Sequence, residues 1–474
     1  MKRMASHIIL VLFATCVLIF LSEQAGFSAT EFADGRIHIT GWLENLSSTR
    51  LGDGPDDGVH EVNKSGRIQI FRNTLQVETT VSMTPDTTLF LNTRGFYEGS
   101  WGLGQGGFEN SIKDSDQVPR GKSVDQDLDL REYHLTARLG DFRLRVGRQQ
   151  VVWGESDALR MSDIINPLDL SWHWVFESWE DIRIPLRMIN LTYEPPSTNQ
   201  FKAQLVYIPE DFRPMAFAPP GAAWAIPGVP AVVWKQQRDE MPGKHELSNG
   251  QVGGRVSGTI GNWDLSLFHF YHRVDGAVYK LDFTHAPLPM DFKWPYVNTV
   301  GATFNKFEPF TKTVFRGESA FTIDQPYTSE VLDKIIEKNT FAFMLGFDRP
   351  TMITTLNPTR SFFISGQFFY KKILDYEGNI VSTDMDRRKD AYVTSILINT
   401  NYWHDKIVPQ ILYVHDFSGG GGNGFGQASI QYVHSETWDV TLGTTYIFGR
   451  RDDEGFFGPV RRNDEVFLRA RVKF

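Results

Sequence analysis

The sequence predicts an all-β fold: a transmembrane antiparallel β-barrel of about eighteen strands with an inward-folded third extracellular loop. Three observations favour this fold: an apolar segment of the leader type at the N-terminus, a C-terminal strand that ends on an aromatic residue, and a regular alternation of short and long connections between predicted strands. Together they predict a protein of the outer membrane of a Gram-negative bacterium.

The N-terminal segment, residues 1–29, is expected to be a cleaved signal peptide. A basic pair precedes the apolar run Ile8–Leu21, which passes into small and polar residues. The run is too short to cross a bilayer as a helix, which takes about 20 residues. A retained N-terminal anchor is the alternative. Cys16, the only cysteine, lies inside this run, so residues 30–474, the expected barrel, carry no thiol for a disulfide or a metal.

The C-terminal strand, residues 464–474, has two different faces. One face is apolar and ends at Phe474, and the other carries three cations. Such a strand fits a barrel with one face in lipid and one in a wet lumen, and a soluble periplasmic protein is the weaker alternative. We expect the barrel-assembly machinery to recognise this strand. The apolar face holds Val466, Leu468, Ala470, Val472 and Phe474, and the other face holds Phe467, Arg469, Arg471 and Lys473.

Between the two ends, short segments with alternating apolar and polar residues predict the remaining strands. Each gives a weak signal alone, because a barrel strand is only about ten residues long. The eighteen predicted strands are 35–47, 67–82, 87–101, 126–139, 141–152, 185–195, 200–208, 249–261, 263–275, 296–308, 311–324, 339–349, 359–372, 389–403, 406–417, 424–434, 438–449 and 464–474.

The connections between these strands carry the stronger argument. Tight turns alternate with long polar loops from the first strand to the last, as expected when all turns are periplasmic and all loops are extracellular. An even number of strands with both termini in the periplasm follows. The predicted turns are 83–86, 140, 196–199, 262, 309–310, 350–358, 405 and 435–437.

Aromatic residues make up 13% of the chain, and several tryptophans fall near predicted strand ends. These would form girdles at the two membrane interfaces, in contact with outer-membrane lipid and lipopolysaccharide. The formal net charge of −9 argues against nucleic-acid binding. The girdle candidates are Trp42, Trp101, Trp263, Trp294, Trp403 and Trp438.

The long connection 153–184 is expected to fold into the lumen as a pore constriction, because an eighteen-stranded barrel is too wide for its own side chains to fill. Ser156 or Asp157 is a candidate cap for one short helix, and Asp169 or Ser171 for a second. The segment contains seven acidic and two basic residues, a net charge of −5, and four tryptophans. Its candidate constriction residues are Trp153, Glu155, Asp157, Arg160, Asp163, Asp169, Glu177, Glu180, Asp181 and Arg183.

Strand alternation places a set of cations on the lumen wall opposite this segment. Two interpretations stay open. The charges either create a transverse field that orients polar solutes, or pair with one another and fix the loop in place. The candidate wall residues are Arg94, Arg145, Lys202, Arg316, Arg469 and Arg471.

One stretch of the chain resembles a known family. The run RVGRQQVVWGESDALRMSDIINPLDL at 145–170, with EDIRIP at 180–185, is similar to the signature of a group of proteobacterial outer-membrane barrels related to the alginate-export porins, which are eighteen-stranded. The resemblance covers some forty residues. It implies a barrel and a channel, and names no substrate.

The sequence therefore predicts a porin-like channel for passive passage of small or oligomeric solutes, with neither the solute nor the direction specified. A structural or scaffold barrel and an outer-membrane hydrolase are the alternatives, although no serine motif identifies a nucleophile. No cofactor or metal is expected: the acidic clusters 52–58 and 451–455 complete no calcium loop. The apolar loop 209–234 either receives an apolar compound or caps the barrel.

Overall fold

The computed structural model describes most of the expected barrel. The described residues are 30–53, 64–102, 126–174, 176–196, 200–209, 212–218, 222–225, 237–239, 249–282, 284, 290–381, 389–418, 422–449 and 456–474. The predicted signal peptide, 1–29, and the cluster 451–455 lie outside them. Within these ranges no helix has the length and apolar character needed to span a bilayer.

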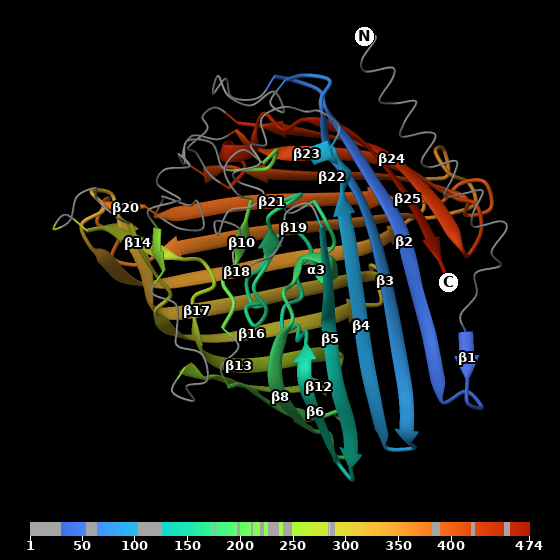
Figure 1. The fold of residues 1–474 in the computed structure, drawn as a ribbon, viewed down its shortest axis with the longest axis horizontal. Helices are drawn as coiled ribbons and strands as arrows, with labels where there is room; N and C mark the ends of the chain where they lie inside the picture. The colour runs from blue at the N-terminus through green and yellow to red at the C-terminus, as the bar shows by residue number, and fades with distance from the viewer. Residues whose placement is uncertain are drawn as a thin grey trace.

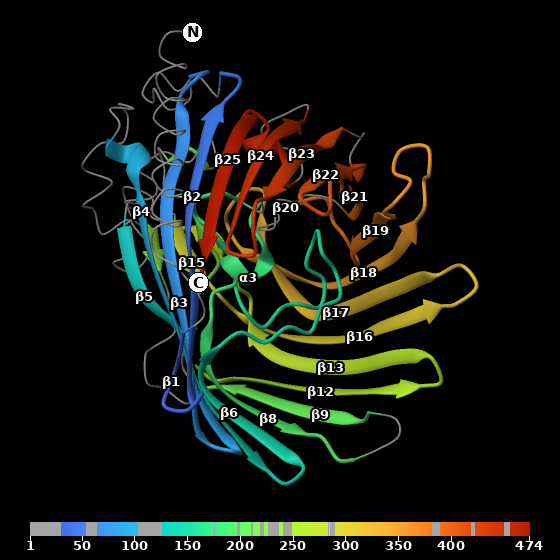
Figure 2. The ribbon, with the colours of Figure 1, turned by 90° about the vertical axis from the view of Figure 1, so that its right-hand side faces the viewer.

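The principal sheet is an antiparallel ring closed by pairing of its first and last long strands (Figures 1 and 2). Eighteen of its twenty strands form the barrel, and the short strands β1 (Thr30–Phe32) and β20 (Ile380–Val381) are additions to it. The barrel strands are β2 (Ile37–Arg50), β3 (Ile68–Thr84), β4 (Thr87–Glu98), β5 (Gln126–Leu139), β6 (Phe142–Gln149), β8 (Leu186–Tyr193), β9 (Lys202–Ile208), β12 (Gln251–Ile260), β13 (Trp263–Arg273), β16 (Tyr296–Glu308), β17 (Thr313–Ser329), β18 (Ile335–Thr351), β19 (Phe362–Ile373), β21 (Asp390–Asn399), β22 (Ile407–Asp416), β23 (Asn423–Val433), β24 (Trp438–Phe448) and β25 (Glu465–Lys473).

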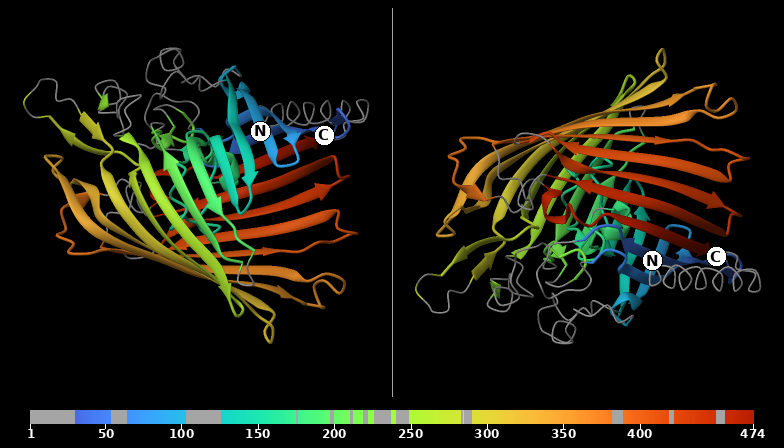
Figure 3. Two further views of the ribbon diagram at one scale, coloured as in Figure 1. Left: turned by 90° about the horizontal axis from the view of Figure 1, so that it is seen from below. Right: turned by 90° about the horizontal axis from the view of Figure 1, so that it is seen from above.

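Each of the eighteen predicted strands corresponds to one of these, so the predicted fold class is confirmed. Figure 3 shows the strands inclined around the ring, with the short turns gathered at one end. The closing seam pairs Trp42 with Lys473 and Arg50 with Glu465. It ends with two backbone hydrogen bonds between Gly41 and Phe474, of 2.8 and 2.9 Å.

One predicted loop is wrong. The sequence suggested a connection at 325–338, but β17 and β18 continue pairing to Thr328 and Ile335. The register shifts between Thr322 and Gln325, where Asp324 has a φ of 53°. This bulge absorbs an extra residue, so the ladder resumes beyond it. Tyr327, fully buried, then bonds Thr340 at 2.6 Å and secures the extension.

The outward face of the barrel is apolar, with aromatic groups near both ends. At the turn end, Trp438 stacks on His434 at 4.2 Å and Trp403 stacks on Tyr432. These contacts fit an interfacial girdle. Large exposed apolar residues on this face include Leu265, Leu267, Val300, Leu345, Phe347, Ile396, Ile411, Ile430 and Leu442.

Two girdle predictions were wrong. Trp42 lies on the lumen face of β2, with the guanidinium groups of Arg471 and Arg94 at 4.6 and 5.4 Å from its ring. These cations make a better site for the ring than lipid does. Trp294 is buried against Phe212 in the long loops. The side chain of Trp101 lies outside the described part of the chain.

Candidate pore constriction

The segment 153–184 lies inside the ring of strands, as Figure 2 shows around the short helix α3 (Trp179–Ile182). It enters the barrel at Trp153, whose side chain is fully buried. The indole Nε1 donates a hydrogen bond to Oε1 of Gln204 on β9 at 2.8 Å, and the ring packs on Phe268 of β13. Apolar packing and one satisfied polar atom therefore fix the start of the segment to the wall.

The two predicted helices are wrong in position and extent. Residues 156–167 contain bends and no helix, and the helix that forms, α3, has Ser178 as its N-cap. The expected caps have other partners. The Ser156 hydroxyl donates to the Leu159 carbonyl, and the Asp157 carboxylate binds side chains of distant strands. Tertiary contacts thus outweigh the local capping preference.

At the far side of the lumen, Arg316 on β17 anchors the first part of the segment. Its guanidinium donates to the carbonyl of Glu155 and to the carboxylate of Asp157, both at 2.6 Å, and also pairs with Asp348. Gln367 on β19 donates to the same Asp157 carboxylate at 3.0 Å. The Asp157 side chain remains 61% exposed, so it faces water in the lumen.

Glu155 is the least tightly paired of these acids. Its carboxylate lies 4.0 Å from Arg255 on β12, and its backbone N–H donates to Glu318 at 2.9 Å. Burial raises the pKa of Glu155, and Arg255 and Arg316 oppose that shift only in part. This carboxyl group therefore takes up a proton more readily than an exposed glutamate does.

The middle of the segment is held by pairs within the loops. Arg183 binds Asp163 at 2.7 Å, with both side chains nearly buried. Arg160 binds Asp275, which follows β13, at 2.7 Å, and also donates to the Asn166 carbonyl. These contacts fold the segment onto itself and onto the neighbouring loop.

The best-buried charges link the segment to the last strand. The ring nitrogens of His173 donate to Glu177 at 2.5 Å and to Glu465 at 2.9 Å, and all three side chains are at most 2% exposed. Arg469 on β25 donates to both carboxylate oxygens of Glu177 at 2.7 Å. Two carboxylates around one imidazole require both ring nitrogens to carry hydrogen. This His173–Glu177–Glu465–Arg469 group, here called the buried clamp, fastens the loop to the barrel.

The charges of the clamp shift its titration. Burial by itself would lower the pKa of His173, but the Glu465 charge and the hydrogen bonds to both glutamates outweigh burial and raise that pKa to about 9. Burial would likewise raise the pKa of Glu177, but Arg469 and His173 outweigh it and hold that pKa at about 2. His173 and Glu177 are therefore both charged near neutral pH.

The end of the segment is tied to β4 and β5. Arg94 binds the Asp181 carboxylate at 2.5 Å, and Arg131 donates to the backbone carbonyls of Glu180, Asp181 and Arg183. Burial opposes ionisation of Asp181, but Arg94 and the Ser178 hydroxyl outweigh it and lower its pKa. The exposed Glu180 carboxylate and Asp169 have no ion pair among the described residues, and Asp169 accepts hydrogen bonds from Ser171.

The predicted wall residues divide into two groups. Arg94, Arg316 and Arg469 bind the segment. Arg471 instead binds Glu44 at 2.6 Å, Lys202 lies 3.9 Å from Glu194, and Arg145 makes no ion pair within the described ranges. Sequence reasoning missed Arg131, Arg255, Glu318, Gln367 and Glu465 as partners, although Arg255 and Gln367 do alternate onto the lumen face.

Apolar side chains of the segment pack against two other loops. Trp174, Leu170 and Ile182 of the segment pack with Trp224 of the neighbouring loop and Phe457 of the last loop in one buried cluster. Arg50 on β2 donates to the Ala223 carbonyl and to the Arg462 carbonyl, and so joins these loops to the wall. The described residues of the loop 209–234 therefore pack against the segment and the last loop, and its two predicted roles both stay predictions.

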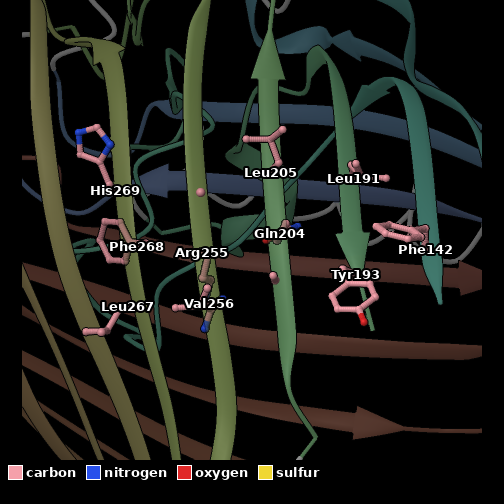
Figure 4. A pocket seen from close by; sticks show the side chains of 12 residues that line it. Phe142, Leu191, Tyr193, Gln204, Leu205, Arg255, Val256, Leu267, Phe268 and His269 are labelled. Atoms are coloured by element: carbon pink, nitrogen blue, oxygen red, sulfur yellow. The ribbon is translucent and has the colours of Figure 1, made fainter. Parts of the chain in front are cut away.

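A pocket of about 400 Å³ lies elsewhere, on the outside of the barrel. Figure 4 shows it over β6, β8, β9, β12 and β13. Leu205, Val256 and Leu267 line it and are 50, 45 and 62% exposed. Because this face is the apolar one, the pocket belongs to the membrane surface and not to the lumen.

Solved structures with the same architecture are outer-membrane channels. The chain is similar to OccAB3 of Acinetobacter baumannii, with 11% identity, 92% of this chain and 99% of that chain covered, and a TM-score of 0.50. It is also similar to a BenF-like porin from Pseudomonas fluorescens Pf-5, with 8% identity, 92% and 98% coverage, and a TM-score of 0.51. At these identities the similarity shows the fold alone.

No match is found among curated proteins. The family model described as "Protein of unknown function (DUF1302)" matches residues 38–474, which is nearly the whole barrel. The chain is thus an outer-membrane β-barrel that belongs to the DUF1302 family.

Proposed function

We propose that this barrel is a porin-like channel through which small solutes diffuse passively, and that it is not an enzyme. One observation carries the proposal: the segment 153–184 lies within the ring and binds inward side chains of β4, β17, β19 and β25. A loop fixed in this way narrows a wide lumen, and its contacts with the wall require no catalytic role. A narrowed, partly charged lumen selects solutes by size and charge.

The segment keeps charged groups in contact with water, as a selective pore requires. Asp157 and Glu180 are exposed, whereas the acids of the clamp are buried and paired. Of the two interpretations of the segment's net charge, pairing therefore accounts for most of the acids, and the few that remain are left to act on solutes. The role of the candidate constriction residues remains part of this proposal.

A sealed scaffold barrel is the second candidate, because the cluster of Trp174, Trp224 and Phe457 fills part of the lumen with apolar side chains. Conductance separates the two functions. Purified protein in a planar bilayer is expected to give discrete current steps, and deletion of 157–180 is expected to enlarge them. A matched deletion of 330–334, at the tip of the β17–β18 hairpin, should leave the step size unchanged. A silent parent protein would favour the scaffold.

Three expectations from the sequence remain predictions. The relation to the alginate-export porins, drawn from residues 145–170, is one. The partners are the second: lipid and lipopolysaccharide on the outer face, and the assembly machinery at the C-terminal strand. Cleavage after residue 29 is the third, and N-terminal sequencing of the membrane-inserted protein tests it.

A further inference from the structure

Four cations gather on the lumen wall near the periplasmic mouth, away from the constriction. We define them as the basic patch: Arg138 on β5, Arg143 and Arg145 on β6, and Lys202 on β9. The turn between β5 and β6 is short, so by the convention of such barrels it is periplasmic. Arg138 and Arg143 lie two residues on either side of that turn.

The inward direction of the patch follows from the register. Gln204 binds Trp153 inside the barrel, so its face of β9 is the lumen face. Thr192 lies opposite Gln204, Arg143 opposite Thr192, and Arg138 opposite Arg143. Residues directly opposite each other in an antiparallel pair share a face. Residues two apart along a strand share it as well, which adds Arg145 and Lys202.

Within the described residues, Glu194 is the one carboxylate that pairs with the patch. Glu194 lies 2.6 Å from Arg143 and 3.9 Å from Lys202. Among the described residues, Arg138 and Arg145 have no side-chain hydrogen bond and no ion pair. On the same hairpin, Glu132 accepts hydrogen bonds from Gln150 and Asp141 makes no ion pair with the patch. Four positive charges thus lie near one paired carboxylate, Glu194, and near Glu132, whose charge also acts on Arg145.

This arrangement is unfavourable unless an anion visits it. Arg138 and Arg143 are cross-strand partners, with Cβ atoms about 4.5–5.5 Å apart, and like charges directly opposite destabilise a sheet. The patch is also accessible, since the side chains of Arg143 and Lys202 are 39 and 54% exposed and Arg138 is exposed too. The charges are therefore available to solute.

We propose that the basic patch is a binding step for carboxylate-bearing solutes at the periplasmic mouth of the pore. A guanidinium group presents paired N–H donors that match the two oxygens of a carboxylate. Arg138 and Arg143 side by side suit one such group, and Arg145 suits a second group on the same molecule. The patch then makes the pore prefer small dicarboxylates, although the segment 153–184 is acidic. This inference rests on the proposed channel function.

The lumen wall across from the basic patch supports the same inference. From β19 to β23 the lumen face in the periplasmic half carries neutral polar residues such as Ser365, Asn399 and Gln410. The charge is therefore one-sided, and a dianion is drawn toward β5 and β6 and not merely through the centre of the pore.

The test uses the whole protein in bilayers of neutral lipid, with succinate as the dicarboxylate probe and chloride as reference. The reversal potential in a potassium succinate gradient gives the succinate-to-potassium permeability ratio. Arg138→Gln with Arg145→Gln removes two cations that make no ion pair among the described residues, so folding should be preserved. We expect this ratio to fall by roughly threefold or more, and the change to shrink at high salt.

The matched control removes two exposed cations that do not line the lumen. Arg349 lies on the outer face of β18 and Lys312 in a periplasmic turn, so Arg349→Gln with Lys312→Gln should leave the ratio unchanged. Reversed charges, Arg138→Glu with Arg145→Glu, should lower the succinate ratio further.

Two results would overturn the inference: a succinate ratio unaltered in the glutamine variant, or a fall as large in the control. An equal fall for succinate and chloride would also overturn it, because it would mean a general field and no carboxylate step. In each case the currents themselves persist, so the channel function stands. Absence of current in every protein would instead remove the proposed function.

Discussion

His173 in the constriction segment donates through Nε2 to Oε1 of Glu465 at the start of β25, at 2.9 Å. The two residues are 292 positions apart in the chain. Their contact belongs to the buried clamp, in which Arg469 also donates to both carboxylate oxygens of Glu177.

Replacing His173 with Phe keeps a ring of similar size but leaves Glu465 as a buried carboxylate without its cation. Removing one partner of a buried ion pair typically costs about 3–5 kcal/mol. We expect the barrel to persist and the segment 153–184 to loosen, seen as faster proteolysis within it and noisier single-channel currents. His269→Phe, on the outer face, is the control. Equal protease resistance of both variants would contradict a fastening role for His173.

The clamp should weaken at alkaline pH. Its His173 pKa is raised from 6.5 to about 9, so the stabilisation is complete below 6.5 and is lost as pH rises through about 9. The pKa of Glu177 is lowered from 4.5 to about 2, so its share is complete above 4.5 and is lost as pH falls through about 2. Protease resistance of the segment should therefore be greatest between 4.5 and 6.5. If the His173→Phe protein still loses protease resistance at alkaline pH, the loss belongs to the titration of another group.

Arg316→Gln should release the tip of the segment from the far wall, because that side chain bonds both the Glu155 carbonyl and the Asp157 carboxylate. Larger and more variable current steps are expected. Lys473→Gln is matched, since Lys473 also pairs with a lumen acid, Asp439, but does not touch the segment. Similar currents in the two variants would mean that charge, and not tethering, sets the step size.

Deleting Phe474 should lower the yield of folded barrel. Its backbone makes two hydrogen bonds with Gly41 at the seam. A Cβ atom added to Gly41 would lie only 2.6 Å from Cζ of the Phe474 ring, so the ring occupies the space that a larger side chain would need. Gly41→Val should therefore reduce assembly as well, whereas Phe474→Tyr should not. The heat-modifiable fraction on gels measures each. Pore currents from the protein that does fold should match the parent.

The strands could be predicted because the evidence for each one, alternating side chains and flanking turn residues, lies within its own stretch of sequence. Val466, Leu468 and Ala470 alternate with Phe467, Arg469 and Arg471 on β25, and the turn residues around Gly140 and Asn262 stand in sequence where the hairpins bend. Side-chain alternation is a property of the strand itself, so it needs no knowledge of partners. The exception is the continuation of β17 beyond residue 324. It depends on a bulge between Thr322 and Gln325, which side-chain alternation does not indicate.

The position of the segment 153–184 inside the ring could be predicted from the sequence, but its local structure could not. Its location follows from its apolar content, whereas the fate of Asp157 depends on Arg316 and Gln367, which come 159 and 210 residues later. Strand alternation indicated Arg316 and Arg469 as inward cations, yet gave no sign of which acid each would bind. Arg145 was placed on the same wall, and nothing in the sequence shows that it would make no ion pair with the described residues.

The closing seam has a consequence for the order of events during biogenesis. Glu44 on the first long strand pairs with Arg471 on the last, 427 positions away. Glu177 pairs with Arg469 on that same last strand. Contacts this distant form late, since loop-closure entropy must be met first. Pairing of β25 with β2 therefore closes the ring, and the same strand brings in Glu465 and Arg469, which fix the segment 153–184 to the wall.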